Sequence, residues 1–154
     1  MIALKRILVP TDFSEASEAA MKYGRALAEA FNASLDVLHV MEDPFVYAPT
    51  SEGYMPPPSF YEEMETATRD RLSKILTDAE REKLRARLVT KKGSPFVEVI
   101  RYAKENGVDL IVMGTHGRGA IAHMLMGSVA EKVVRKGPCP VLTVRHPEHE
   151  FVMP

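Results

Sequence analysis

The chain has 154 residues, of which 45% are apolar and 27% are charged, and its formal net charge is −1. It is long enough to bury one hydrophobic core, and its composition is typical of a globular domain. A net charge near zero disfavours general nucleic-acid binding, and no apolar run approaches the roughly 20 residues that a membrane-spanning helix needs.

The first quarter of the chain predicts a strand, a helix and a second strand. Residues 6–10 (RILVP) form a short apolar run that is typical of a strand covered on both faces. The helix begins after Ser14, a suitable N-cap with acidic residues in the next turn, and ends at Asn32. Residues 34–41 (SLDVLHVM) predict the second strand, so this unit requires a right-handed parallel crossover.

A proline-rich segment, residues 42–59, then interrupts the alternation. It holds five of the eleven prolines and can form neither a helix nor a central strand, so we interpret it as a long loop. Apolar spacing predicts one long helix from about Phe60 to Glu82. Residues 86–91 (ARLVTK) predict the third strand.

The remaining sequence predicts two further strand and helix pairs. GSPF at residues 93–96 begins a helix, with the serine as N-cap and the proline at the first helical position, and an Asn-Gly pair ends it. Residues 108–113 (VDLIVM) predict a buried fourth strand, which a glycine-rich loop joins to a last helix ending at Gly137. Residues 139–144 (CPVLTV) predict the fifth strand.

Five strands alternating with four helices predict an α/β fold, a Rossmann-like open parallel sheet with helices on both faces. We expect one domain, residues 1–145, followed by a tail, residues 146–154. The start, MIALKRILVPTD, lacks the apolar stretch of a secretory signal. The single cysteine, Cys139, excludes an internal disulfide and favours a reducing compartment, so we expect a cytoplasmic protein.

Four glycines lie between the fourth strand and the last helix, in MGTHGRGAIAHMLMGS. Ligands of such sheets bind beyond the carboxyl ends of the strands. Gly114 would let a ligand approach without meeting a Cβ, whereas Gly117 and Gly119 could take positive φ and aim amide N–H groups at an anion. Gly127 and Ser128 open a helix whose first amides and positive dipole end face the same region. These features favour a phosphate site.

A plain turn explains the loop equally well from these residues alone. SVAE places Ser128 three residues before Glu131 as a capping box, which would account for the serine without any ligand. Two better-known phosphate motifs do not fit. A P-loop requires a lysine after its last glycine, and GRGAIA, which mimics a dinucleotide fingerprint, follows the fourth strand rather than the first.

The spacing Gly114-x2-Gly117-x9-Gly127-Ser128 resembles the nucleotide-binding signature G-x2-G-x9-G-(S/T) of the universal stress protein family. RILVPTDFSEAS, LHVM, DLIVMGTHGRG and GSVAEKVVRKGPCPVLTVR are similar to the family's blocks in the same order, so the resemblance covers nearly the whole chain. It implies the strand order 3-2-1-4-5 of the adenine nucleotide alpha hydrolase-like folds, and the complete signature implies the ATP-binding branch.

The resemblance also implies an ATP site. Residues at the ends of the first two strands would line the adenosine pocket, those ending the fourth strand would lie beside the ribose, and those of the loop and last helix would hold the phosphates. In that order they are Pro10, Thr11, Asp12 and Val40; Met113 and Gly114; and His116, Gly117, Arg118, Gly127, Ser128 and Val129. A magnesium ion could accompany the triphosphate, but no residue is predicted as its ligand.

Several of these residues have structural alternatives. Asp12 could cap the first helix, Val40 could belong to the core, and His116 could be a solvated loop residue. Cys139, which stands between two prolines, is interpreted as a buried thiol rather than a reactive one.

No residue resembles an activated nucleophile or a general base. The resemblance therefore implies an ATP-binding regulatory or stress-response protein with at most slow ATP hydrolysis. The proline-rich loop leaves the second strand near the expected pocket and could act as a lid, or be a plain insertion. The alternative function is a nucleotide-independent homodimeric scaffold. The fifth strand should lie at a sheet edge, and the family commonly pairs it across a dimer, here through Val141 to Val144.

Overall fold

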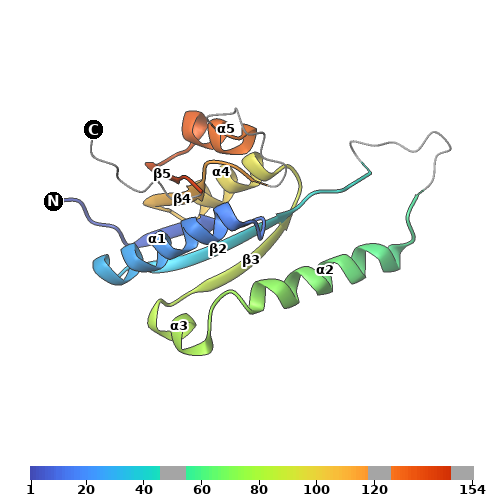
Figure 1. The fold of residues 1–154 in the computed structure, drawn as a ribbon, viewed down its shortest axis with the longest axis horizontal. Coiled ribbons are helices and arrows are strands. Elements are labelled where there is room, and N and C mark those ends of the chain that lie inside the picture. Colours follow the sequence, from blue (N-terminus) through green and yellow to red (C-terminus); the bar gives the residue numbers. More distant parts are fainter. Residues whose placement is uncertain (46–54, 118–125, 147–154) are drawn as a thin grey trace.

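The computed structural model describes residues 1–45, 55–117 and 126–146, which contain five strands and five helices (Figure 1). In chain order these elements are β1 (Arg6–Pro10), α1 (Glu15–Phe31), β2 (Ser34–Met41), α2 (Pro58–Ser73), α3 (Asp78–Lys83), β3 (Arg87–Lys92), α4 (Pro95–Glu105), β4 (Leu110–Gly114), α5 (Ser128–Lys136) and β5 (Val141–Val144).

All four strand pairs are parallel, and the order across the sheet is β3-β2-β1-β4-β5. The predicted fold class and strand order are therefore confirmed. The chain builds outward from β1 to β3, then returns to the other side of β1, where Ile7 pairs with Leu110 of β4. The carboxyl ends of β1 and β4 are neighbours at this reversal, which is where open α/β sheets bind ligands.

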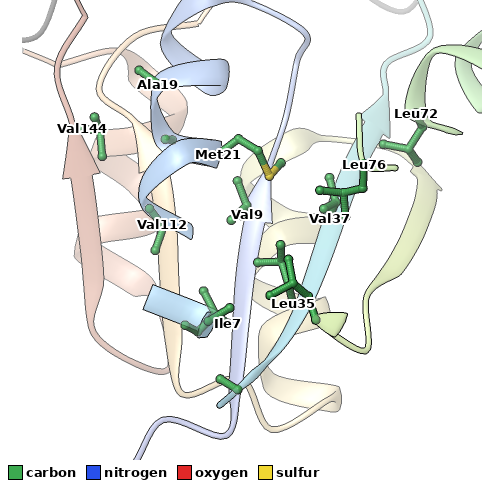
Figure 2. Packing of buried hydrophobic residues seen from close by; sticks show 14 residues of the cluster. Ile7, Val9, Ala19, Met21, Leu35, Val37, Leu72, Leu76, Val112 and Val144 are labelled. Atoms are coloured by element: carbon green, nitrogen blue, oxygen red, sulfur yellow. The ribbon is translucent and has the colours of Figure 1, made fainter. Parts of the chain in front are cut away.

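The apolar strands form a core on each face of the sheet. On one face, α1 packs over the inner strands, where Ala19 and Met21 share a buried cluster with Val9 and Val112, and Figure 2 shows Met21 beside Val9. On the other face, α4 and α5 cover Leu8, Leu38, Ile111 and Met113. Because both faces are covered, the strands are apolar on both sides, which is why they form continuous apolar runs in the sequence.

The single helix predicted from about Phe60 to Glu82 is wrong, because the structure has two helices there. α2 ends at Ser73, and α3 begins after Thr77. The Thr77 hydroxyl accepts a hydrogen bond from the Glu80 N–H (3.2 Å), and the Glu80 carboxylate accepts one from the Thr77 N–H (2.8 Å). This capping box is a helix start signal that apolar spacing alone does not reveal.

The other helix ends largely follow the predictions. Ser14 is the N-cap of α1 and accepts from the Ser17 N–H at 3.3 Å, and Asn32 ends the helix in the left-handed conformation with φ 51°. Ser94 occupies the N-cap of α4 as expected, but its side chain makes no capping hydrogen bond. The fifth strand begins at Val141, two residues later than predicted.

A buried carboxylate at Asp36 links the elements at the amino end of the sheet. Its side chain is fully buried and accepts two hydrogen bonds from Arg87 (2.9 and 2.6 Å) and one from the Tyr102 hydroxyl (3.0 Å). Burial, reinforced by the neighbouring Asp36 carboxylate, raises the pKa of Tyr102 to about 12, so the phenol stays a donor at neutral pH. Asp36 thus joins β2 to β3 and α4.

We expect Asp36→Ala to lower the free energy of unfolding by about 2–4 kcal/mol. The substitution removes the hydrogen-bond acceptor of the buried Tyr102 hydroxyl and the bidentate partner of Arg87. Urea denaturation followed by circular dichroism measures this change. Asp70→Ala is the control, since Asp70 forms only an exposed pair with Lys74 and should leave the midpoint nearly unchanged. Equal shifts in the two variants would contradict a structural role for Asp36.

Candidate functional site

A cavity of about 760 Å³ opens at the carboxyl ends of the central strands. Its walls come from the ends of β1, β2 and β4, from the start of α5 and from one side of α2. The volume is within the usual range for sites that bind small molecules, and the position is at the reversal of strand order. Both properties make this cavity the candidate ligand site.

Eleven of the twelve predicted site residues line this cavity, and the remaining one, Arg118, lies outside the described residues. The structure therefore brings together side chains from three strand ends and a helix start. Their individual roles in nucleotide binding stay predictions. The eleven are Pro10, Thr11, Asp12, Val40, Met113, Gly114, His116, Gly117, Gly127, Ser128 and Val129.

The tip of β1 is held by a local network of hydrogen bonds. The Thr11 hydroxyl accepts from the Phe13 N–H (3.1 Å) and lies 3.1 Å from the Ser17 hydroxyl. The Thr11 carbonyl lies 2.8 Å from His39 Nδ1, which must carry the proton of this hydrogen bond. Thr11 is thus fixed by α1 on one side and β2 on the other.

Asp12 does not cap the first helix, because Ser14 is the N-cap. One Asp12 carboxylate oxygen accepts from the Ser14 N–H at 3.0 Å and also from the Ser14 hydroxyl. The other oxygen faces the glycine loop, since a Cβ added at Gly117 would lie 2.6 Å from it. Asp12 therefore supports the cap and extends across the cavity toward the loop that follows β4.

One expectation for the glycine loop is corrected, and Gly114 has a packing role as well. A Cβ at Gly114 would lie 2.9 Å from the backbone carbonyl of Ala16, so close packing of α1 on β4 requires this glycine whether or not a ligand binds. Gly117 does not have the positive φ expected of an anion nest, and Gly119 lies outside the described residues. Gly117 instead leaves room for the Asp12 carboxylate.

The capping box expected at Ser128 is absent. Gly127 is the N-cap of α5 and Ser128 is the first helical residue, so the serine does not cap this helix. The Gly127 N–H donates to the Thr115 carbonyl at 2.6 Å, which closes the described ends of the loop against each other. Helix capping therefore leaves Ser128 unexplained, and the residue lines the cavity.

Three cavity residues that the sequence did not indicate stack on one another. The Phe13 ring lies 4.6 Å from the His39 ring between centroids, and the Arg71 guanidinium carbon lies 4.2 Å from the Phe13 centroid. Phe13 has φ 63°, a left-handed conformation that bulky residues rarely adopt. No sequence signal gives this backbone angle, and the single-helix prediction did not place Arg71 at the pocket.

Charges on the described cavity wall are unequal. The carboxylates are Asp12, Glu42 and Asp43, whereas the only lysine or arginine on the described wall is Arg71. Glu42 and Asp43 begin the predicted proline-rich loop, of which residues 46–54 lie outside the description. Within the described part of the chain, no three acidic, histidine or cysteine side chains gather as they would around a metal ion.

Cys139 is not a cavity residue. Its side chain is half-buried, and burial, with a smaller contribution from the negative charge of Asp109, raises the pKa of the thiol. The thiol therefore stays protonated at neutral pH, as expected of an unreactive cysteine. None of the helices in the described parts of the chain is long and apolar enough to cross a membrane.

The variants Gly114→Ala and Gly117→Ala should distinguish a glycine that helix packing requires from a glycine that borders the cavity. We expect Gly114→Ala to cost about 1–3 kcal/mol of stability, because its new methyl group meets Ala16 backbone that cannot move alone. Gly117→Ala should shift the melting temperature little, because the Asp12 side chain can rotate away. Thermal unfolding by calorimetry compares the two, and a Gly117→Ala shift as large as that of Gly114→Ala would contradict this assignment.

Comparisons with known proteins agree with this geometry. The model of the universal stress protein family matches residues 3–145. Universal stress protein MJ0531 of Methanocaldococcus jannaschii is 35% identical over 147 residues, which cover 95% of this chain and 85% of that protein.

Solved structures agree as well. The universal stress protein UspA from Lactobacillus plantarum matches with a TM-score of 0.71 and 25% identity, covering 94% of this chain and all of that one. A universal stress protein in complex with cAMP matches with a TM-score of 0.63 and 26% identity, covering 93% and 98%.

Proposed function

The chain belongs to the universal stress protein family, and we propose that it is an ATP-binding member that acts as a nucleotide-dependent regulatory or stress-response protein. The observation that carries this proposal is the convergence of Gly114, Gly117, Gly127 and Ser128 with the β1 tip on one cavity. The related protein in complex with cAMP supports an adenine nucleotide as the class of ligand. A cytoplasmic location, consistent with the single cysteine, is part of the proposal.

The proposed phosphate position is the start of α5. Gly127 has no side chain with which to cap the first amides of this helix, and Ser128 adds a hydroxyl group beside them. An anion at a helix start gains roughly 0.3–1 kcal/mol, and about 2 kcal/mol in favourable geometry. Even the larger value corresponds to only about thirtyfold in affinity, so base and ribose contacts must supply most of the binding free energy.

The proposed base and ribose position is the opposite part of the cavity. Val40 and the β1 tip, from Pro10 to Asp12, line the wall there, and Met113 and Gly114 lie between this wall and α5. ATP bound in this way would span the reversal of strand order. A magnesium ion could accompany the triphosphate, and Asp12 is the carboxylate that faces the Gly117 side.

Rapid hydrolysis is not part of the proposal. The titratable side chains nearest the loop already have hydrogen-bond partners, since Asp12 accepts from Ser14 and His116 Nδ1 pairs with the Thr115 hydroxyl at 2.9 Å. In both pairs the partner is a neutral serine or threonine group and not an acid that would orient a general base. Binding that changes shape or partners, with at most slow turnover, fits these groups better.

We expect purified protein to release stoichiometric adenine nucleotide on denaturation, as measured by chromatography, and the stripped protein to bind ATP in calorimetric titrations. Gly117→Val should weaken binding at least tenfold, because its side chain enters the space beside Asp12. Gly107→Asn is the control, at a left-handed position with open space that does not line the cavity. Absence of nucleotide and of binding at millimolar ATP would refute the proposal.

We also propose a homodimer through β5, which is an edge strand of the sheet. Leu142 on this strand is 37% exposed. Exposed apolar edge strands are usually covered by another element or by a second chain. The same observation supports the second candidate function, a scaffold that dimerises without nucleotide. Light scattering at tens of micromolar should give a dimer for the wild type and a monomer for Leu142→Lys, with or without ATP. A wild-type monomer would exclude both the dimer and the scaffold.

A further inference from the structure

Helix α2 is attached to the domain by few buried side chains. Of its sixteen residues only Thr68 and Leu72 are buried, and both lie in its second half. Figure 1 shows the helix beside β3, with its first turns extending beyond the sheet. The position of such a helix depends on the contacts that its last turns make. One of them is made by Arg71, which lines the candidate ligand cavity and lies over the Phe13 ring.

The Arg71 contact joins three separate elements. Arg71 belongs to α2, Phe13 to the turn after β1, and His39 to β2, and their side chains stack in the order Arg71, Phe13, His39. The His39 ring is in turn bonded to the Thr11 carbonyl at 2.8 Å. A continuous set of contacts therefore runs from α2 to the tip of β1, and every member lines the cavity.

The backbone at Phe13 needs this support. A φ of 63° is unfavourable for a phenylalanine and persists only where surrounding contacts hold it. The Thr11 hydroxyl accepts a hydrogen bond from the Phe13 N–H, and the Phe13 ring contacts both His39 and Arg71. Asp12 lies between Thr11 and Phe13 in the same turn, and its carboxylate accepts hydrogen bonds from the Ser14 N–H and hydroxyl.

We propose that Arg71 is a positioning residue of the nucleotide site, which holds Phe13 and the β1 tip in the binding arrangement and thereby couples α2 to nucleotide binding. This inference rests on the proposed function and identifies α2 as the element that nucleotide binding would regulate. Ligand binding would desolvate the stack, which strengthens a cation–π contact. Because coupling is reciprocal, nucleotide binding would hold α2 in place to the same extent that Arg71 improves affinity.

The first test is calorimetric ATP titration of variants at Arg71. Arg71→Leu should weaken binding about three- to tenfold, whereas Arg71→Lys, which keeps a cation over the ring, should recover most of the affinity. Arg69→Leu is the matched control, because Arg69 is two residues away on α2, is 71% exposed, pairs with Glu65 and does not line the cavity. Phe13→Leu combined with Arg71→Leu should be no worse than the larger single effect.

Hydrogen exchange on α2 provides a readout that a purely structural role would not change. ATP should slow exchange of α2 amides in the wild type and in Arg69→Leu, but much less in Arg71→Leu. Wild-type affinity in Arg71→Leu, or an equal loss in Arg69→Leu, would overturn the inference while leaving the proposed function in place. Failure of the wild type to bind ATP would overturn both.

Discussion

The pairing of β1 with β4 is the constraint on which the candidate site depends. These strands are distant in sequence, yet Ile7 pairs with Leu110 and Leu8 with Ile111 at the centre of the sheet. Because both strands run in the same direction, the turn after β1 and the glycine loop after β4 emerge side by side. The Asp12 carboxylate consequently faces Gly117, and a side chain at Gly114 would strike α1. Neither contact exists without this pairing.

The two ends of the cavity differ in how firmly the fold holds them. The glycine-loop side is built on close backbone packing, with Gly127 bonded to Thr115 and Gly114 against Ala16. The opposite side is completed by α2, whose attachment uses few buried groups and a stack over Phe13. In the proposed binding mode, the phosphates would lie on the side of this backbone packing, and the base would lie on the side of the more weakly attached α2. Ligand occupancy could then change the position of one helix without disturbing the sheet.

The sequence was sufficient for the architecture because the strands are covered on both faces and therefore form apolar runs. Strand order came from the resemblance to a known family, as did cavity residues such as Val40 and Met113, whereas the glycines and Ser128 of the loop were indicated by their own chemistry and position. The sequence did not reveal the break between α2 and α3, where Thr77 and Glu80 form a capping box within a continuous apolar pattern. The left-handed Phe13 and its stack with Arg71 were also missed, since long-range packing rather than local preference determines them.

The reasons for individual glycines and serines were harder to predict than their location. Gly114 serves helix packing, Gly117 serves an acidic side chain, and Ser128 does not form its expected capping box.

The crystal structure of the complex with ATP is the most direct test of the proposed binding mode. We predict phosphates at the start of α5 near Gly117 and Ser128, with the base beside Val40 and the Phe13 stack. A nucleotide in the reverse orientation, or outside this cavity, would contradict it.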